Sequence, residues 1–193
     1  MSESRGLCGC CAKFLISAAI TALIIWISFR FTKPRYYLVA FSIPAPNSSA
    51  VTASFRLEIE NRNRQVGIYH DDIALTLLAG PNLSSPVSHF IIPKFYQGHL
   101  KTAEKLGNFS AAKNLTGFAG DSVFRVSVES AYRFKVLGRK TSHHAVKASG
   151  TVEVDDGGEK TARKGIRLSS SGADVVRPLV TVVVLLYTLG LHI

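Results

Sequence analysis

Cysteine is scarce in this chain and absent from most of it. The 193 residues include three cysteines, Cys8, Cys10 and Cys11, and no cysteine follows them. A secreted domain held together by disulfides is therefore excluded, because such domains need paired cysteines along their length. The cluster is also a poor zinc site, since no fourth ligand stands near it.

Charge is missing from one long segment near the start. Residues 14–29, "FLISAAITALIIWISF", are uncharged and stand between Lys13 and Arg30. The run is short for a membrane-crossing helix, but flanking Lys and Arg side chains can extend toward the headgroups. We predict an uncleaved transmembrane anchor over residues 13–31. The alternatives are a cleaved signal peptide, although no A-x-A-like site follows, and a buried soluble helix, which would need a polar face.

The segment before this anchor, residues 1–12, contains all three cysteines. Cysteines at a cytosolic membrane boundary are candidates for S-acylation, and unmodified thiols are the alternative. Charges on the two sides of the anchor are too similar to settle its orientation.

Asparagine is also uncommon, and most asparagines stand in glycosylation sequons. Four of the six fit N-x-S/T, and all four follow the predicted anchor. This pattern predicts that the domain is extracellular and the N-terminus cytosolic, as in a plasma-membrane glycoprotein. The N-glycosylation candidates are Asn47, Asn82, Asn108 and Asn114.

The far end of the chain, residues 169–193, consists of small residues, a short spacer and an apolar tail. This is the order of a GPI-attachment signal, with Ser169, Ser170 and Ser171 as candidate attachment residues. A retained second membrane segment is the alternative.

A domain anchored from both ends needs its ends close together, because few residues follow Leu168. We therefore expect Tyr36 and Leu168 at the same end of the domain.

Alternating apolar and polar residues recur between the two ends. The pattern is clearest in residues 51–60, "VTASFRLEIE", and residues 124–136, "FRVSVESAYRFKV". Each is typical of a strand buried on one face. Shorter runs at "YYLVAFSI", "IALTLLA", "VSHFII" and "VKASGTVEV" are separated by turn-rich pieces. We predict an all-β domain over residues 36–168, an antiparallel β-sandwich of the immunoglobulin or fibronectin type.

Two motifs stand out within this domain: "NRNRQVGIYHDD", residues 61–72, and "IPKFYQGH", residues 92–99. With the Cys-rich start and the anchor, they resemble the plant non-race-specific disease resistance and harpin-induced-like family, whose domain is a late embryogenesis abundant group 2 sandwich. Arg62 departs from the Asn-Pro-Asn of that family and removes a fixed φ angle. The motif residues are Asn61, Asn63, Gly67, Ile68, Tyr69, Asp71, Asp72, Pro93, Lys94, Phe95, Tyr96, Gln97, Gly98 and His99.

The resemblance implies a plasma-membrane protein of plant defence that contributes to hypersensitive-response signalling and to contact between membrane and cell wall. It implies no catalytic activity, and we expect no catalytic, cofactor-binding or metal-binding residues. It also implies that a cytosolic immune regulator can bind residues 1–12.

"GIYHDD" invites a competing hypothesis, because His70 precedes two carboxylates. A metal-dependent hydrolase would need a third ligand beside His70 and a carboxylate, and the sequence cannot place His99, His143 or His144 there. We favour a turn between strands, with Asp71 and Asp72 at the rim of the sheet. A sandwich that binds lipid or another apolar ligand in a large cavity is the other alternative.

The aromatic residues of "IPKFYQGH" either form a recognition surface with Lys94 and His99 or pack a loop against the domain. The chain is basic, with a net charge of +10, and "EKTARKGIR" concentrates part of that charge. We expect membrane lipids or acidic cell-wall polysaccharide as counterparts and no nucleic acid, because the domain is predicted to be extracellular. A solvated basic face is the alternative.

Overall fold

The computed structural model describes residues 13–23, 31–43, 52–80, 82–109, 123–136, 138–155 and 157–169. The chain divides into two units, one formed by Met1–Phe31 with Asp174–Ile193 and the other by Thr32–Ala173. Several predicted features lie outside the described residues, so the structure does not test them: Cys8, Cys10, Cys11, Asn47, Asn114, Ser170, Ser171 and residues 24–30 of the predicted anchor.

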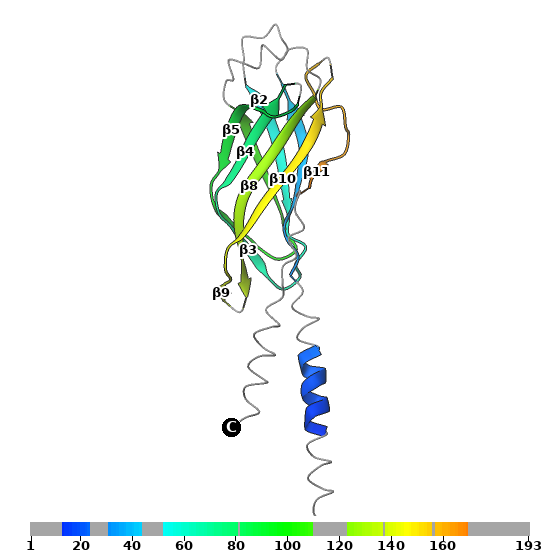
Figure 1. The fold of residues 1–193 in the computed structure, drawn as a ribbon, viewed down its shortest axis with the longest axis vertical. Coiled ribbons are helices and arrows are strands. Elements are labelled where there is room, and N and C mark those ends of the chain that lie inside the picture. The colour runs from blue at the N-terminus through cyan, green and yellow to red at the C-terminus, as the bar shows by residue number, and fades with distance from the viewer. Residues whose placement is uncertain are drawn as a thin grey trace, which may run out of the picture. The chain divides into compact units, whose positions relative to one another are not determined.

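In the first unit, residues 13–23 form an α-helix (Figure 1). Its apolar side chains, among them Phe14, Leu15 and Ile16, are exposed. The Thr21 hydroxyl donates a hydrogen bond to the Ser17 carbonyl oxygen at 2.8 Å. No helix within the described ranges is long and apolar enough to cross a membrane.

The second unit consists of antiparallel sheets, so the predicted all-β class is confirmed. The first sheet has the strand order β11-β1-β2-β7, and the second has the order β5-β4-β8-β3-β6, with β9 and β10 also paired to β8. The strands in chain order are β1 (Arg35–Ser42), β2 (Ala53–Glu60), β3 (Gly67–His70), β4 (Ile73–Ala79), β5 (Ser85–Ile92), β6 (Phe95–Gln97), β7 (Thr102–Phe109), β8 (Val123–Val136), β9 (Arg139–Lys140), β10 (His144–Glu153) and β11 (Ile166–Leu168).

The buried residues follow the predicted alternation. In β2 the side chains of Ala53, Phe55, Leu57 and Ile59 are all buried, and their neighbours in the strand face outward. Apolar burial of this kind is the main force that holds such sheets together. Aromatic rings join the two sheets. Phe55 of β2 lies 5.2 Å from Phe90 of β5, and Phe41 of β1 lies 6.0 Å from Phe124 of β8, measured between ring centroids.

Strand β8 organises the larger sheet. β10 pairs with it along one side, and β4 and β3 follow each other along its other side (Figure 1). His70 pairs with Tyr132 and Ala74 with Glu129, so four steps along β3–β4 match three steps along β8. One extra residue is therefore accommodated between His70 and Ala74, which is a β-bulge.

The ends of the domain lie together, as predicted. Tyr36 of β1 pairs directly with Leu168 of β11. Beyond this pair, the backbones of Ser149 and Ser169 exchange two hydrogen bonds, of 3.0 and 3.1 Å, and so join the two sheets along one edge. We call the end of the sheets at which residues 31–34 lead into β1 the root end, and the opposite end the far end.

Two turns at the far end lie between β4 and β5 and after β10. Gly80 and Leu83 both have positive φ, 92° and 50°, in the turn between β4 and β5, where Asn82 is exposed. The Asp155 carboxylate accepts hydrogen bonds from the backbone nitrogens of Gly157 and Glu159, at 3.0 and 2.9 Å. Such Asp-centred turns need no packed core, because the side chain replaces backbone partners locally.

Candidate functional site at the root of the domain

Buried polar side chains are concentrated at the root end. Among the described residues, the polar or charged side chains classed as buried are Asn61, Asn63, His70 and Gln97, with exposed fractions of 1%, 5%, 2% and 3%. Burying polar groups costs free energy unless each finds a hydrogen-bond partner. Their partners therefore show what the two sequence motifs do.

Asn61 and Asn63 form one connected network. The Asn61 amide nitrogen donates to the carbonyl oxygens of Val66 and Gly98, both at 3.0 Å. Its oxygen accepts from the Asn63 backbone nitrogen at 3.0 Å and the Asn63 amide nitrogen at 2.8 Å. Asn63 in turn bonds Thr32 twice through the backbone, accepting from its nitrogen at 2.7 Å and donating to its carbonyl oxygen at 2.8 Å. The network thus fastens the segment that enters β1 to the loop after β2.

Arg62 stands between these asparagines, at the position where the resemblance implies proline. Its side chain is exposed, and its Nε lies 2.8 Å from the Glu60 carboxylate. The substitution leaves both buried amides in their network, because residue 62 points away from them.

Gln97 and His70, both in the larger sheet, make the second buried contact, and Gln97 also joins the two sheets through Ile59 of β2. The Gln97 amide nitrogen donates to the carbonyl oxygens of Ile59 and Lys101, at 2.7 and 2.6 Å. Its oxygen lies 2.9 Å from His70 Nε2. Because both amide hydrogens of Gln97 are used, the remaining bond needs His70 Nε2 as the donor. The His70 ring also stacks on Phe95, with the centroids 4.6 Å apart and the planes inclined by 16°.

This geometry keeps His70 neutral. Nδ1 is buried without a hydrogen-bond partner, so a proton there would have nothing to bond. Burial lowers the pKa of His70 to about 4, and this effect outweighs the opposing effect of the hydrogen bond that His70 donates to Gln97. His70 is almost fully enclosed and its Nε2 is occupied, so it does not face a substrate.

Asp71 and Asp72 are each engaged in holding the bulge between β3 and β4. The Asp71 carboxylate bonds Arg133 Nη2 at 3.3 Å and His143 Nδ1 at 2.8 Å. The Asp72 carboxylate accepts from the Lys94 backbone nitrogen at 2.8 Å. The prediction that both lie at the rim of the sheet was wrong, since the ladders of β8 and of β5–β6 flank them. Asp71 and Asp72 are adjacent because the bulge between β3 and β4 needs an extra residue. They do not form a paired carboxylate site.

Two tyrosines of the motifs, Tyr69 and Tyr96, lie on the outer face of the larger sheet, where they contact each other and two lysines. Tyr69 and Tyr96 pair across β3 and β6, and their ring centroids lie 4.7 Å apart. Lys140 Nζ lies 4.4 Å from the centre of the Tyr69 ring, and Lys135 Nζ lies 5.3 Å from that of Tyr96. A Cβ on Gly67 would stand 2.6 Å from Tyr96 Cζ, so glycine is what allows the Tyr96 ring to cross the backbone there.

Most of the remaining predicted residues lie at the surface. Pro93, Lys94 and His99 are exposed, and Asn108 is exposed near the end of β7. Ile68 is buried in the core beside His70. The ranges that the structure describes contain no group of three or more His, Cys, Asp or Glu side chains that could hold a metal ion. Within the motif "IPKFYQGH", Phe95 and Gln97 therefore pack inward, whereas Tyr96 is exposed.

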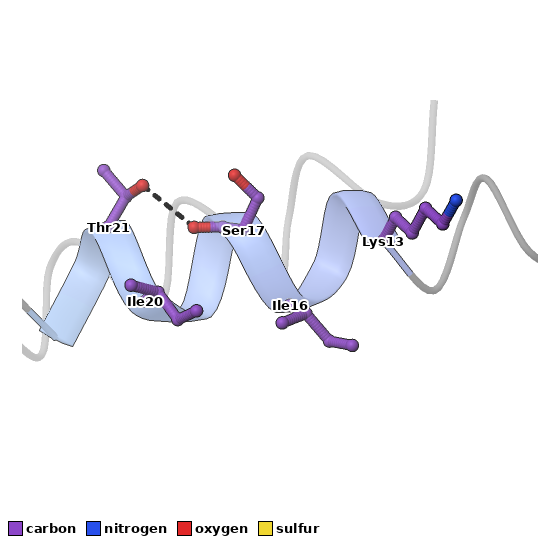
Figure 2. Close-up of a pocket in the computed structure, with 5 residues that line it drawn as sticks. All are labelled: Lys13, Ile16, Ser17, Ile20 and Thr21. Atoms are coloured by element: carbon purple, nitrogen blue, oxygen red, sulfur yellow. Dashed lines mark hydrogen bonds between the residues drawn. The ribbon is translucent and has the colours of Figure 1, made fainter.

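A shallow hollow lies against the helix of the first unit (Figure 2). The residues that line it, Lys13, Ile16, Ser17, Ile20 and Thr21, recur at helical spacing on one face. A hollow along one helix face offers no converging polar groups, so it does not suggest a binding site.

Comparison with known proteins identifies relatives of this chain. Protein NDR1 from Arabidopsis thaliana is 35% identical over 183 residues, covering 86% of this chain and 84% of that protein. NDR1/HIN1-like proteins 12 and 3 from the same plant are 35% and 32% identical, over 100 and 88 residues. They cover 48% and 43% of this chain, which spans 46% and 37% of theirs.

No family model matches the chain. Among solved structures, a protein from Archaeoglobus fulgidus aligns with 64% of this chain and 97% of its own, at 7% identity and a TM-score of 0.35, which is too low to support an argument. The resemblance drawn from "NRNRQVGIYHDD" and "IPKFYQGH" agrees with the curated relatives. The chain belongs to the NDR1/HIN1-like family.

Proposed function

We propose that this chain is a non-enzymatic plasma-membrane protein of plant defence that contributes to hypersensitive-response signalling. Membership of the NDR1/HIN1-like family supports the role in defence. In this proposal residues 13–31 cross the membrane, the N-terminus is cytosolic, and the two sheets form an extracellular sandwich of the immunoglobulin or fibronectin type. Contact with the cell wall is part of the same proposal.

The observation that carries the proposal is the bond between Asn63 and Thr32. Thr32 directly follows the predicted anchor, and Asn63 holds its backbone nitrogen and carbonyl oxygen at once. These bonds tie the first residue after the predicted anchor into the buried network of the domain. Such a junction suits a protein that transmits contacts on one side of a membrane to the other.

The absence of catalysis is supported by how the polar motif residues are used. Gln97 occupies Nε2 of His70 inside the domain, and the carboxylates of Asp71 and Asp72 bond groups of the same sheet. Catalytic acids and bases need access to substrate. Each of these side chains has instead a partner that explains its presence.

Lipid attachment completes the proposal at both ends of the chain. We propose S-acylation within Cys8, Cys10 and Cys11 and a binding site for a cytosolic immune regulator in residues 1–12. For the GPI signal, Ser169 is a weaker candidate than Ser170 or Ser171, because its backbone is bonded to Ser149.

Complementation tests the function directly. The chain is expressed in an Arabidopsis thaliana line that lacks Protein NDR1, and hypersensitive cell death is scored after challenge with an avirulent bacterium. We expect the response to be restored. An Asn63→Ala variant, adjusted to equal surface abundance, should restore it less. A chain that reaches the surface at normal level and restores nothing contradicts the proposed function.

Enzymatic treatment of membrane fractions tests the topology. A glycan-removing enzyme should lower the apparent mass of the chain in sealed cells, and an Asn82→Gln, Asn108→Gln variant should shift less. A phosphatidylinositol-specific phospholipase removes the GPI lipid if one is attached. Resistance to the glycan-removing enzyme in both sealed and opened membranes would contradict the extracellular placement.

A further inference from the structure

The outer face of the larger sheet carries two tyrosines and two lysines at the root end. Residues alternate between the faces of a strand, so the buried side chains of Ile68 and His70 leave Tyr69 on the outer face. Tyr96 pairs with it and is 48% exposed. We call Tyr69, Tyr96, Lys135 and Lys140 the root patch.

Two like charges stand directly opposite each other in this patch. Lys135 of β8 pairs with Lys140 of β9 in the antiparallel ladder, which puts both side chains on the same face. Like charges in this position destabilise a sheet. At the neighbouring ladder position Arg139 is exposed on the opposite face, so it does not belong to the patch. Within the described residues, no carboxylate lies within salt-bridge distance of these three cations.

The carboxylate that follows β3, the strand that carries Tyr69, already has hydrogen-bond partners of its own. Asp71 follows β3 and is bonded to Arg133 and His143. The ammonium groups of Lys140 and Lys135 lie instead over the faces of Tyr69 and Tyr96. Cation–π contacts hold the two charges in place without neutralising them. The patch therefore presents ordered, uncompensated positive charge beside exposed aromatic edges.

The position of the patch indicates which anion it meets. The Tyr96 ring crosses Gly67, which directly follows the loop that Asn61 and Asn63 tie to Thr32. If residues 13–31 cross the bilayer as proposed, Thr32 directly follows the membrane segment in the chain, and the loop bonded to Thr32 is the part of the domain tethered nearest to the headgroups. Tyrosine is enriched at that level of a membrane, and basic residues there are attracted by anionic lipids.

We propose that the root patch binds the phosphate-bearing headgroup of an anionic phospholipid in the same bilayer that holds the chain. This inference rests on the proposed membrane location. The tyrosines lie at the level of the headgroups, and Lys135 and Lys140 bond the phosphate oxygens. The second contact restrains rotation of the domain about its anchor.

Lysine acylation in nanodiscs tests the inference with the full chain. The chain is inserted into discs of phosphatidylcholine alone or mixed with phosphatidylserine, and an amine-reactive ester labels exposed lysines. Mass spectrometry then gives the rate at each site. We expect Lys135 and Lys140 to react about fivefold more slowly in the anionic discs, as follows from the attraction of one basic residue to such a surface.

Lys147 is the matched internal control. It lies in β10 of the same sheet, is exposed, and is bonded to Glu129 at 3.0 Å. Its rate should not depend on the lipid. Hydrogen exchange provides a second readout, because backbone amides of β8–β9 should gain protection in anionic discs. The Lys135→Gln, Lys140→Gln variant should lose that gain, whereas Lys147→Gln should keep it.

Three results would overturn the inference. Equal labelling of Lys135 and Lys140 in both discs excludes a lipid headgroup and leaves the proposed function in defence intact. Slower labelling only after polygalacturonate is added to phosphatidylcholine discs assigns the patch to acidic polysaccharide. A chain that inserts into neither disc contradicts the proposed membrane location and the inference together.

Discussion

At the root end Asn61 is buried in a connected network, whereas at the far end the Asp155 side chain is exposed and bonds locally. Asn61 contacts groups up to 37 residues away in the chain, and Asp155 contacts groups at most four residues away. A long-range buried network is lost as a unit, because removing one member leaves several buried partners unsatisfied. Local turns lose only their own bonds.

The largest expected difference between the ends is in the free energy of unfolding that is lost when one polar side chain is truncated at each end. Asn61→Ala leaves buried groups of Val66, Gly98 and Asn63 without partners, so we expect a loss of about 4 kcal/mol in the free energy of unfolding. Asp155→Ala should cost about 1 kcal/mol. Denaturant unfolding of the two variants measures both values. Equal losses would remove the distinction between the ends.

The second prediction concerns acid stability, which should depend on the root end through His70. Its pKa is lowered to about 4 in the folded chain, from a usual value of 6.5. Between these values the unfolded state binds a proton that the folded state does not. Stability is therefore complete above about pH 6.5 and falls by about 3 kcal/mol as the pH drops to about 4.

His70→Gln provides the control, because glutamine fills part of the same space and does not titrate. Unfolding followed from pH 7 to pH 4 should show a smaller slope for this variant. If the two slopes agree over the whole range, His70 is not the group responsible.

Gly67→Ala should have a smaller effect confined to the outer face. The added Cβ meets the Tyr96 ring, which is 48% exposed and can rotate away. We expect a loss of about 1 kcal/mol together with separation of the Tyr69 and Tyr96 rings. The aromatic chemical shifts of Tyr69 report the separation. If the two rings stay in contact in the variant, the Gly67 position does not order the root patch.

Strands with a buried and an exposed face could be predicted from the sequence, as β2 and β8 show. β7 (Thr102–Phe109) could not, because it lies at the edge of its sheet and exposes even Leu106. β6 has only three residues after Pro93, which is shorter than any useful period. Edge position and short length both weaken the apolar alternation on which the prediction depends.

The motif residues could be found from the sequence, but their roles could not. Gln97 reaches the carbonyl oxygen of Ile59, 38 residues earlier, and Asp71 reaches His143, 72 residues later. Such contacts depend on how the two sheets meet. A buried histidine beside two aspartates looked like a possible metal site because sequence spacing does not reveal which face each side chain takes.

The most direct test of this account is amide hydrogen exchange at Thr32, because its backbone nitrogen donates to Asn63 Oδ1 at 2.7 Å. The account predicts that Thr32 is protected in the parent chain and loses protection in Asn63→Ala, while the Gly157 amide at the far end exchanges at the same rate in both. Protection at Thr32 that survives Asn63→Ala would contradict the claim that the family motif fastens the domain at its root.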